Sequence, residues 1–471
     1  MKKIYFLFLL CINVIKLNAQ VYETDHISMH SNWFDTAVVA EPAYGIKYNG
    51  IWGYATGGHE YALVGSTAGV YFVDVTNPAA PVTADFVAGH RDQCIWREIK
   101  TYSHYAYLIS DDASPNSFQI VDLQYLPDSV HVVADYSTLF ERGHTIFIDG
   151  NKMYIGIARG GMFTSTASMA VFSLANPEIP VFLRSINNDY PSLLTYNQVH
   201  DMFVKNDTVY ASCAYDGLFI FKYDSILNHF NLLSSLTTYP DQGYNHSSAL
   251  TDDSQTLVFM DEVPAGKAVK VVDVSDLQNM VVTSTFKSNT GPTPHNPFIV
   301  GNTCYIAYYL DGLQVYDVSD PYLPVRIGYF DTHYQEPLGG PYPSLAYQGA
   351  WGAYPYLPSG NVLVSDMQNG LYVLDVTAMT GLSHPTAENQ TVVFPNPAVA
   401  GEIIRIKSSQ FKNQEVVVSV IDALGKVVSK STTMFNEFLD LNTSKLPAGV
   451  YTLQLVSGED HVERRVVITT L

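Results

Sequence analysis

The stretch Gly69-Val-Tyr-Phe-Val-Asp74-Val-Thr-Asn-Pro78-Ala-Ala-Pro81 decides the fold, because variants of it recur along the chain. Each copy combines a small turn, a strand of apolar residues and, in most copies, an Asp near the strand's end. The other copies lie at residues 117–123 (SFQIVDL), 169–180 (MAVFSLANPEIP), 217–223 (GLFIFKY), 269–274 (VKVVDV), 312–324 (GLQVYDVSDPYLP) and 370–376 (GLYVLDV). Equivalent positions 74, 122, 173, 222, 273, 317 and 375 are 44 to 58 residues apart, which matches one four-stranded propeller blade.

These seven copies predict an all-β protein whose main domain is a seven-bladed β-propeller. The seventh copy has no fourth strand of its own, whereas residues 27–34 (ISMHSNWF) precede the first blade without a partner. If this N-terminal strand pairs as the fourth strand of the last blade, it closes the ring and removes two open sheet edges. We expect the repeated Asp to cap a turn in each blade, with Ser173 and Lys222 taking its place in the third and fourth copies.

The two ends of the chain read differently from the repeats. Lys2 and Lys3 precede an apolar run at residues 5–15, and Leu17-Asn18-Ala19 is a plausible cleavage triplet. The expected organisation is a signal peptide (1–19), the propeller (20–383), a linker (384–391) and a C-terminal domain (392–471). In that last domain, residues 416–421 and 427–428 predict a hairpin of a small β-sandwich.

Composition narrows the possible partners. Without residues 1–19 the chain has 22 basic and 45 acidic residues, a net charge of −23, which disfavours nucleic acid and anionic membranes. After the leader, no apolar run is long enough to predict a transmembrane span. The remaining cysteines are Cys94, Cys213 and Cys304. The last two lie in apolar strands, where a buried thiol acts as a small hydrophobe.

Aromatic residues recur where the first strand of each blade begins. This position lines a propeller's channel, and reading it around the ring gives Trp52, Trp96, His144, His200, His246, His295 and Trp351. Acidic residues gather in the loops expected on the same face: Asp111, Asp112, Asp216, Asp261, Glu262, Asp311 and Asp366. Asp201 directly follows His200, and Glu98 follows Trp96 by two residues.

Three interpretations of this ring stay open. The histidines can bridge neighbouring blades through hydrogen bonds to the backbone. Alternatively, His144, His200, His246 and His295 can bind a divalent metal, because imidazole with carboxylate suits zinc, manganese or iron. The third interpretation is an organic ligand, held by His144, His200, Asp201, His246 and His295 and walled by Trp52, Trp96 and Trp351. For Arg97, both an inter-blade ion pair and an anion clamp remain open.

The C-terminal block resembles the type A sorting domain of the type IX secretion system of Bacteroidetes. The residues that carry the resemblance are Pro395, Asn396, Pro397, Gly425, Lys426, Leu446, Gly449, Val450, Tyr451 and the ending 464–468 (RRVVI). The resemblance implies handling by the type IX machinery, so the protein would pass through Sec and then the outer membrane. It would end in the extracellular space or at the cell surface.

The propeller resembles LVIVD-repeat proteins of the choice-of-anchor B type. The matching segments are residues 51–54, 96–100, 200–201, 295–296 and 349–351. That resemblance implies a fold and an address but no chemistry, and no G-x-S-x-G, H-E-x-x-H or P-loop motif is present.

Two functions from different classes therefore remain. The protein is either a binding module that recognises an extracellular protein or glycan through its channel face, or a metal-dependent hydrolase or lyase. Catalysis stays undecided from the sequence. A divalent metal is the one cofactor that the histidine ring suggests.

Overall fold

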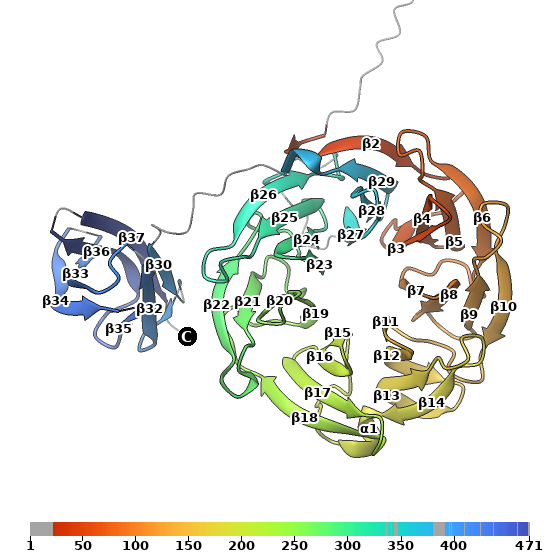
Figure 1. Cartoon of the computed structure of the whole chain (residues 1–471), viewed down its shortest axis with the longest axis horizontal. Coiled ribbons are helices and arrows are strands. Elements are labelled where there is room, and N and C mark those ends of the chain that lie inside the picture. The colour runs from red at the N-terminus through yellow and green to blue at the C-terminus, as the bar shows by residue number, and fades with distance from the viewer. Residues whose placement is uncertain are drawn as a thin grey trace, which may run out of the picture.

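A computed structural model describes residues 22–334, 338–340, 342, 347–379, 391–394, 396, 398–408, 410–423, 425–436, 438–458 and 460–469. Within these residues, seven antiparallel sheets surround a central channel as blades, and two further sheets form the C-terminal domain (Figure 1). The expected signal peptide (1–19), Pro395 and Pro397 lie outside the described residues.

Each blade runs from an inner strand at the channel to an outer strand at the rim. The first three blades are β3 (Tyr48–Thr56), β4 (His59–Ser66), β5 (Gly69–Asp74) and β6 (Val82–Ala88); β7 (Arg97–Tyr102), β8 (Tyr105–Ser110), β9 (Phe118–Asp122) and β10 (His131–Tyr136); and β11 (Thr145–Asp149), β12 (Lys152–Gly160), β13 (Phe163–Ser173) and β14 (Val181–Ser185).

The next three blades repeat this order. They are β15 (Asp201–Lys205), β16 (Thr208–Ser212), β17 (Leu218–Asp224) and β18 (His229–Leu236); β19 (Asn245–Leu250), β20 (Thr256–Asp261), β21 (Val269–Asp273) and β22 (Val281–Phe286); and β23 (Asn296–Val300), β24 (Thr303–Ala307), β25 (Leu313–Asp317) and β26 (Val325–Phe330). The short helices are α1 (Ile186–Asp189), η1 (Leu277–Asn279) and η2 (Thr377–Met379).

The N-terminal strand closes the ring as the sequence predicts. The last blade consists of β27 (Ala350–Tyr354), β28 (Val362–Asp366), β29 (Gly370–Asp375) and β2 (Ser28–Trp33), which pairs antiparallel with β29. The chain also adds β1 (Thr24–Asp25) to the edge of β26, a pairing too short to leave a pattern in the sequence. Together these pairings tie the start of the chain to two blades.

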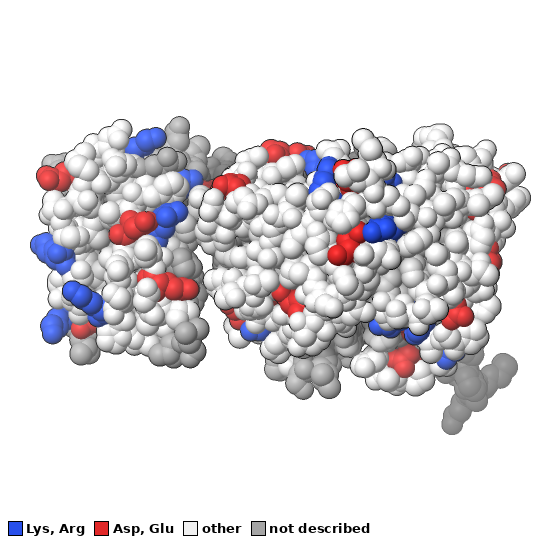
Figure 2. Space-filling model, turned by 90° about the horizontal axis from the view of Figure 1, so that it is seen from below, with Lys and Arg blue, Asp and Glu red and all other residues white. Residues whose placement is uncertain are grey.

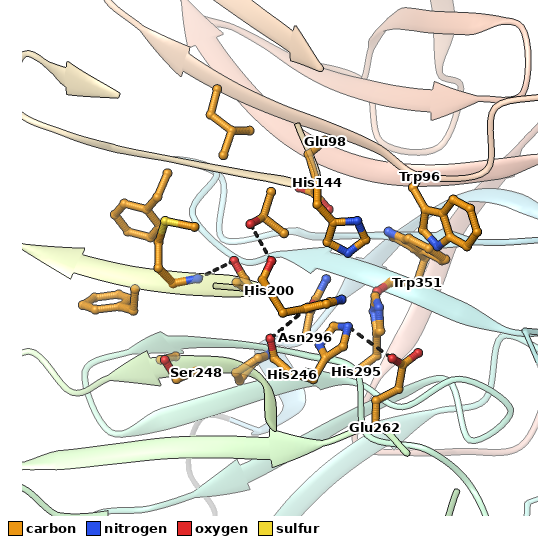
Figure 3. A pocket seen from close by; sticks show the side chains of 18 of the residues that line it. Trp96, Glu98, His144, His200, His246, Ser248, Glu262, His295, Asn296 and Trp351 are labelled. Carbon is orange, nitrogen blue, oxygen red and sulfur yellow. Dashed lines mark hydrogen bonds and ion pairs between the residues drawn. The ribbon is translucent and has the colours of Figure 1, made fainter. Parts of the chain in front are cut away.

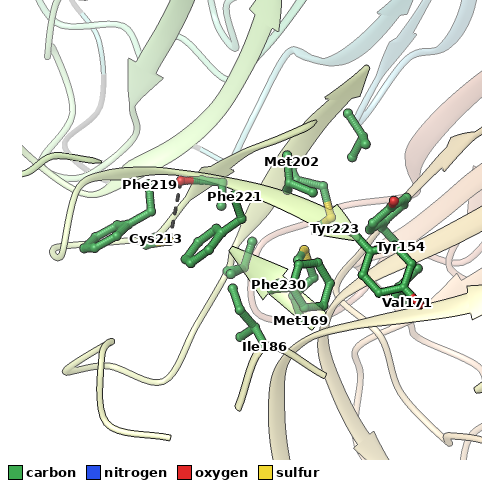
Figure 4. Packing of buried hydrophobic residues seen from close by; sticks show 14 of the residues in the cluster. Tyr154, Met169, Val171, Ile186, Met202, Cys213, Phe219, Phe221, Tyr223 and Phe230 are labelled. Atoms are coloured by element: carbon green, nitrogen blue, oxygen red, sulfur yellow. Dashed lines mark hydrogen bonds between the residues drawn. The ribbon is translucent and has the colours of Figure 1, made fainter. Parts of the chain in front are cut away.

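Apolar side chains between neighbouring blades form the core. Between the third and fourth blades, Tyr154 and Met169 pack against Met202, Phe221 and other buried residues (Figure 4). The same cluster contains Cys213, and Cys304 lies in the cluster of the fifth and sixth blades, which confirms both thiols as buried hydrophobes. Burial of this kind dominates the stability of the ring.

The repeated Asp caps turns, and one assignment needs correction. Asp74 Oδ1 accepts the backbone N–H of Thr76, and the other copies do the same two residues on: Asp122, Ser173, Asp273, Asp317 and Asp375. In the fourth blade Lys222 has no such role and donates to the carbonyl of Asn206. Asp224 caps that turn instead, because β17 runs two residues further.

The C-terminal domain packs two sheets over one core. One sheet contains β30 (Thr391–Phe394), β32 (Ile403–Ser408) and β35 (Phe438–Asn442); the other contains β31 (Ala398–Val399), β37 (Asp460–Thr469), β36 (Gly449–Ser457), β33 (Gln414–Asp422) and β34 (Val427–Phe435). The predicted hairpin is β33–β34, turned at Gly425 with φ +82° beside Lys426. Gly449 opens β36, and Tyr451 is buried in the core.

Asn396 ties the start of this domain to the last strand. Its side-chain N–H donates to the carbonyl of Arg465 over 2.7 Å, and its Oδ1 accepts the N–H of Val467 over 2.9 Å. The side-chain amide of Asn396 therefore bonds one carbonyl and one N–H group of β37.

The surface carries few charges. On the face in Figure 2, acidic and basic side chains are scattered singly or in small groups of opposite sign, and most of the visible surface is uncharged. Within the described residues, no helix is long and apolar enough to span a bilayer.

Candidate functional site

A cavity of about 650 Å³ occupies the channel where the inner strands of all seven blades converge. Eleven aromatic side chains line it: Trp52, Trp96, Phe147, Phe203, Tyr215, Tyr244, Phe298, Tyr347, Trp351, Tyr354 and Tyr356. Its polar and charged members include Glu98, Lys100, His144, His200, Asp201, His246, Glu262, His295 and Asn296. All eight channel residues predicted from the sequence line it.

Strand register corrects the level of two of them. In five blades the inner-strand residues that pair with equivalent positions of the second strand are Ile146, Met202, Ser248, Pro297 and Ala353. The aromatic residue lies two positions before each of them: His144, His200, His246, His295 and Trp351. In the second blade Arg97 holds that position, so Trp96 is displaced by one residue. In the first blade Trp52 lies three positions further along, beside Tyr354 at 4.9 Å between ring centroids, because β3 begins earlier with a bulge.

The four imidazoles form a continuous arc. Neighbouring ring centroids are 4.2 Å apart for His144 and His200, 4.3 Å for His200 and His246, and 4.4 Å for His246 and His295. Trp351 extends the arc at 4.8 Å from His295 (Figure 3). Equivalent positions on consecutive blades bring these rings together although the residues are 46 to 56 positions apart.

Two histidines bridge neighbouring blades. His200 Nδ1 lies 3.2 Å from the backbone oxygen of His246, and His295 Nδ1 bonds the backbone oxygen of Trp351. Because a carbonyl only accepts, each Nδ1 carries the proton and each neutral ring keeps its Nε2 lone pair free. The bridging interpretation therefore holds for these two, and the same bridge prepares Nε2 as a ligand.

Gly349 sets the position of Trp351. It has φ +87°, and a Cβ there would lie 2.1 Å from the carbonyl oxygen of Tyr309. That carbonyl accepts the N–H of Ala350 over 2.9 Å, which anchors the start of β27 to the previous blade. Only glycine can lie this close to the carbonyl with a positive φ. The close packing places the indole of Trp351 next to the arc.

Burial keeps three of the four imidazoles uncharged. His200 and His246 are 7% and 4% exposed, and burial together with the neighbouring imidazoles lowers both pKa values well below 6.5. Burial also lowers the pKa of His295 to about 3. These three rings are neutral at pH 7, which is the form that binds metals or accepts hydrogen bonds.

Two loop acids reach the arc. Asp111 lies 3.1 Å from His144 Nδ1, and Glu262 Oε2 lies 3.7 Å from His246 Nε2. Glu262 Oε1 accepts the hydroxyl of Tyr309 over 2.7 Å, and burial raises the pKa of this carboxyl. The other predicted loop acids form hydrogen bonds within the loops and blades instead: Asp112, Asp216, Asp261, Asp311 and Asp366.

A second charged group lies elsewhere on the wall. Lys100 Nζ is 3.6 Å from Glu98 and 4.1 Å from the ring centre of Trp52. Burial, followed by the charge of Glu98, raises the pKa of Asp201 to about 7. The cavity thus contains three carboxyl groups and a single ammonium that is already engaged.

Arg97 joins neighbouring blades through backbone carbonyls rather than through the predicted ion pair. Its guanidinium is buried and donates to the backbone oxygens of Ser66, Thr67 and Arg91. It therefore joins the first two blades through carbonyls, without an acidic partner among its recorded bonds. Burial lowers its pKa, and the nearby charges of Asp112 and Asp92 offset only part of that effect.

Some polar atoms of the wall are buried without a hydrogen-bond partner in the described part of the chain. Trp351 Nε1 is an unused donor, and Asn296 Oδ1 is an unused acceptor. His246 Nδ1 is a third such atom. Buried polar groups are seldom left unpaired, so this wall is suited to a partner that supplies both kinds of group.

Sequence reasoning missed several residues of this site. Glu262 appeared only as one of many loop acids, and Tyr309 had no signal at all. Asn296 directly follows a ring histidine, and alternation along the inner strand could have placed it on the cavity wall. Tyr244 and Tyr347 come from inter-blade loops, which follow no repeat.

Comparisons with known proteins agree with this architecture. Residues 392–469 match the Secretion system C-terminal sorting domain, and residues 298–332 match the LVIVD repeat. No curated protein matches the sequence.

Solved structures share the fold at low identity. The extracellular domain of a proposed hybrid two-component system from B. thetaiotaomicron is 11% identical with a TM-score of 0.50; the match covers 94% of this chain and 57% of that one. Proposed 6-phosphogluconolactonases from Bacteroides fragilis and Bacteroides uniformis are 11% and 10% identical, with TM-scores of 0.45 and 0.46. Those matches cover 84% and 80% of this chain, and 97% and 96% of theirs.

The sorting domain fixes the destination of the protein. Domains of this type direct export by the type IX secretion system to the cell surface or extracellular space. The chain is thus an exported β-propeller protein with an LVIVD repeat and a C-terminal sorting domain of the type IX secretion system.

Proposed function

We propose that the exported propeller is a binding module that takes the end of a neutral glycan into its channel cavity. The observation that carries this proposal is the pairing of an unused donor, Trp351 Nε1, with an unused acceptor, Asn296 Oδ1, on one aromatic wall. A hydroxyl group can satisfy either atom, because it both donates and accepts.

The size of the cavity favours a small ligand over a folded partner. A volume of about 650 Å³ falls within the range of small-molecule sites, whereas a protein interface of standard size needs about 800 Å² on each partner. The arc residues themselves are nearly inaccessible, with His295 and Trp351 only 3% and 4% exposed. Only a chain end that enters the channel comes close to them, whereas a flat surface stays outside.

The charges in the cavity disfavour anions. Glu98, Asp201 and Glu262 face the same space as Lys100, whose ammonium already contacts Glu98 and Trp52. Carboxyl groups accept hydrogen bonds from sugar hydroxyls, and aromatic faces bury the apolar faces of the rings. Neutral sugars therefore suit the site better than sulfated or uronic glycans.

A glycan array probed with the full exported chain tests this function. Trp351→Phe keeps the ring and removes only Nε1–H, so affinity for the bound neutral glycan should fall about tenfold, near the value of one lost hydrogen bond. Trp33→Phe is the matched control, since Trp33 packs against Tyr48 and Tyr71 away from the cavity. Equal loss in both variants, or binding confined to anionic glycans, contradicts the proposal.

A further inference from the structure

We propose that His200, His246 and Glu262 bind one divalent transition-metal ion at the wall of the channel cavity. One nitrogen from each histidine and one carboxylate oxygen lie within 4.8 Å of one another. In the described residues these three side chains form the one group of this kind. The inference goes beyond ligand binding, because the ion needs no organic ligand in the cavity.

The donor atoms are prepared for a metal. The bond from His200 Nδ1 to the carbonyl of His246 leaves the Nε2 lone pair free, as in metal sites whose histidines are oriented by an outer hydrogen bond. His246 Nε2 and Glu262 Oε2 are 3.7 Å apart, too far for a hydrogen bond. Two ligands of a tetrahedral zinc ion, each about 2.1 Å from it, lie about 3.4 Å apart, so this pair already has nearly the right separation.

The local charge calls for a cation. Glu262 is largely buried, and no Lys or Arg of the described residues forms a recorded ion pair with it. Its recorded partners are the hydroxyl of Tyr309 and the imidazole of His246. A buried carboxylate without a cation is costly, and a divalent ion bound to two neutral imidazoles removes that cost.

The surroundings of His246 decide which of its nitrogens can bind a metal. This residue is 96% buried, since only 4% of it is exposed, and its ring also interacts with the backbone of His295. Glu262 faces Nε2, so Nδ1 is the atom that must carry the proton if Nε2 is a ligand. The cavity beside the group leaves a coordination position for water or a hydroxyl, as in zinc sites with two histidines and a glutamate.

The set differs from the four histidines that the sequence suggests. His295 and His144 flank the arc, but neither joins a group of three ligands within this distance among the described residues. His144 Nδ1 is already 3.1 Å from Asp111. In the proposed set, the carboxylate of Glu262 replaces His144 and His295 as a ligand. Two imidazoles and one carboxylate suit zinc, cobalt, manganese or iron(II).

Metal titration of the full exported chain tests the proposal. The metal-free protein is titrated with Co²⁺, read by its visible absorption, and then with Zn²⁺ as competitor. One ion per chain and displacement by zinc are expected. Glu262→Gln keeps the acceptor for Tyr309 and removes the charge, and it should weaken Co²⁺ binding at least about 100-fold, more than changes outside the ligand set usually do.

The matched control is Glu98→Gln, a carboxyl of the same cavity outside the group, which should keep wild-type affinity. Similar losses in both variants, or no Co²⁺ bound at 1:1, overturn the proposal. X-ray absorption of the zinc-loaded wild-type chain provides a test without variants: two imidazoles support the site, and none or four overturn it. Glycan binding is measured separately, by titration of the metal-free chain. A failure of the metal site can therefore be told apart from a failure of the glycan site.

Discussion

His200 Nδ1 lies 3.2 Å from the backbone oxygen of His246, the equivalent residue of the next blade. This one bond joins two blades, fixes the proton on Nδ1 and turns Nε2 towards the shared arc. A residue that stabilises the ring is thereby also prepared to bind a ligand. The bridging and binding interpretations of the histidines therefore do not exclude each other.

The bridge predicts a stability loss on substitution. His200→Ala leaves a buried carbonyl unpaired, which costs about 1–3 kcal/mol, and Tm should fall by about 1–2 °C for each kcal/mol in a domain of this size. Melting in the presence of a chelator separates this effect from metal binding. His90→Ala, in the exposed loop after β6, should leave Tm unchanged. An unchanged Tm for His200→Ala would show that the bridge contributes nothing.

The buried histidine His295 predicts acid sensitivity. Its pKa of about 3 in the folded chain lies below the ordinary 6.5, so the unfolded chain binds the extra proton first as pH falls. Stability present above pH 6.5 is lost by about 1.4 kcal/mol per pH unit down to about pH 3. His295→Gln cannot titrate, so denaturant titrations at pH 6.5 and 4.5 should show a smaller loss in the variant. Equal losses contradict this assignment.

Asp201 predicts the opposite dependence. Its pKa of about 7 exceeds the ordinary 3.8, so the folded chain keeps a proton that the unfolded chain releases between these values. Stability therefore falls as pH rises from about 4 to 7, by about 4 kcal/mol at most. Asp201→Asn should be more stable than wild type at pH 8 and equal to it at pH 4. A constant difference across this range argues against a protonated Asp201.

The sequence predicts the ring well because a propeller repeats its hydrogen-bonded strands at a fixed length. The closure by β2, the turn-capping role of Asp74 and the hairpin β33–β34 all follow from local patterns. The level of Trp52 could not be predicted, because a bulge in β3 shifts register without changing composition. Glu262 and Tyr309 meet only through folding, since they come from different blades.

Asn396 predicts a link between stability and export. Asn396→Ala removes two hydrogen bonds to β37, and the C-terminal domain should lose about 1–3 kcal/mol. If export requires a folded sorting domain, the variant should accumulate in the periplasm, measured by fractionation. Lys430→Ala, on the exposed strand β34, is the control and should be exported normally. Normal export of a destabilised Asn396→Ala domain would contradict the link.

Tryptophan fluorescence tests the central claim most directly, because three of the four tryptophans line the cavity. In a Trp33→Phe chain every remaining indole reports on the channel: Trp52, Trp96 and Trp351. Titration with the neutral glycan selected by the array should shift or quench this emission in a saturable 1:1 curve. A glycan that binds the chain with the same affinity while leaving the emission unchanged would place the ligand outside the channel and contradict the account.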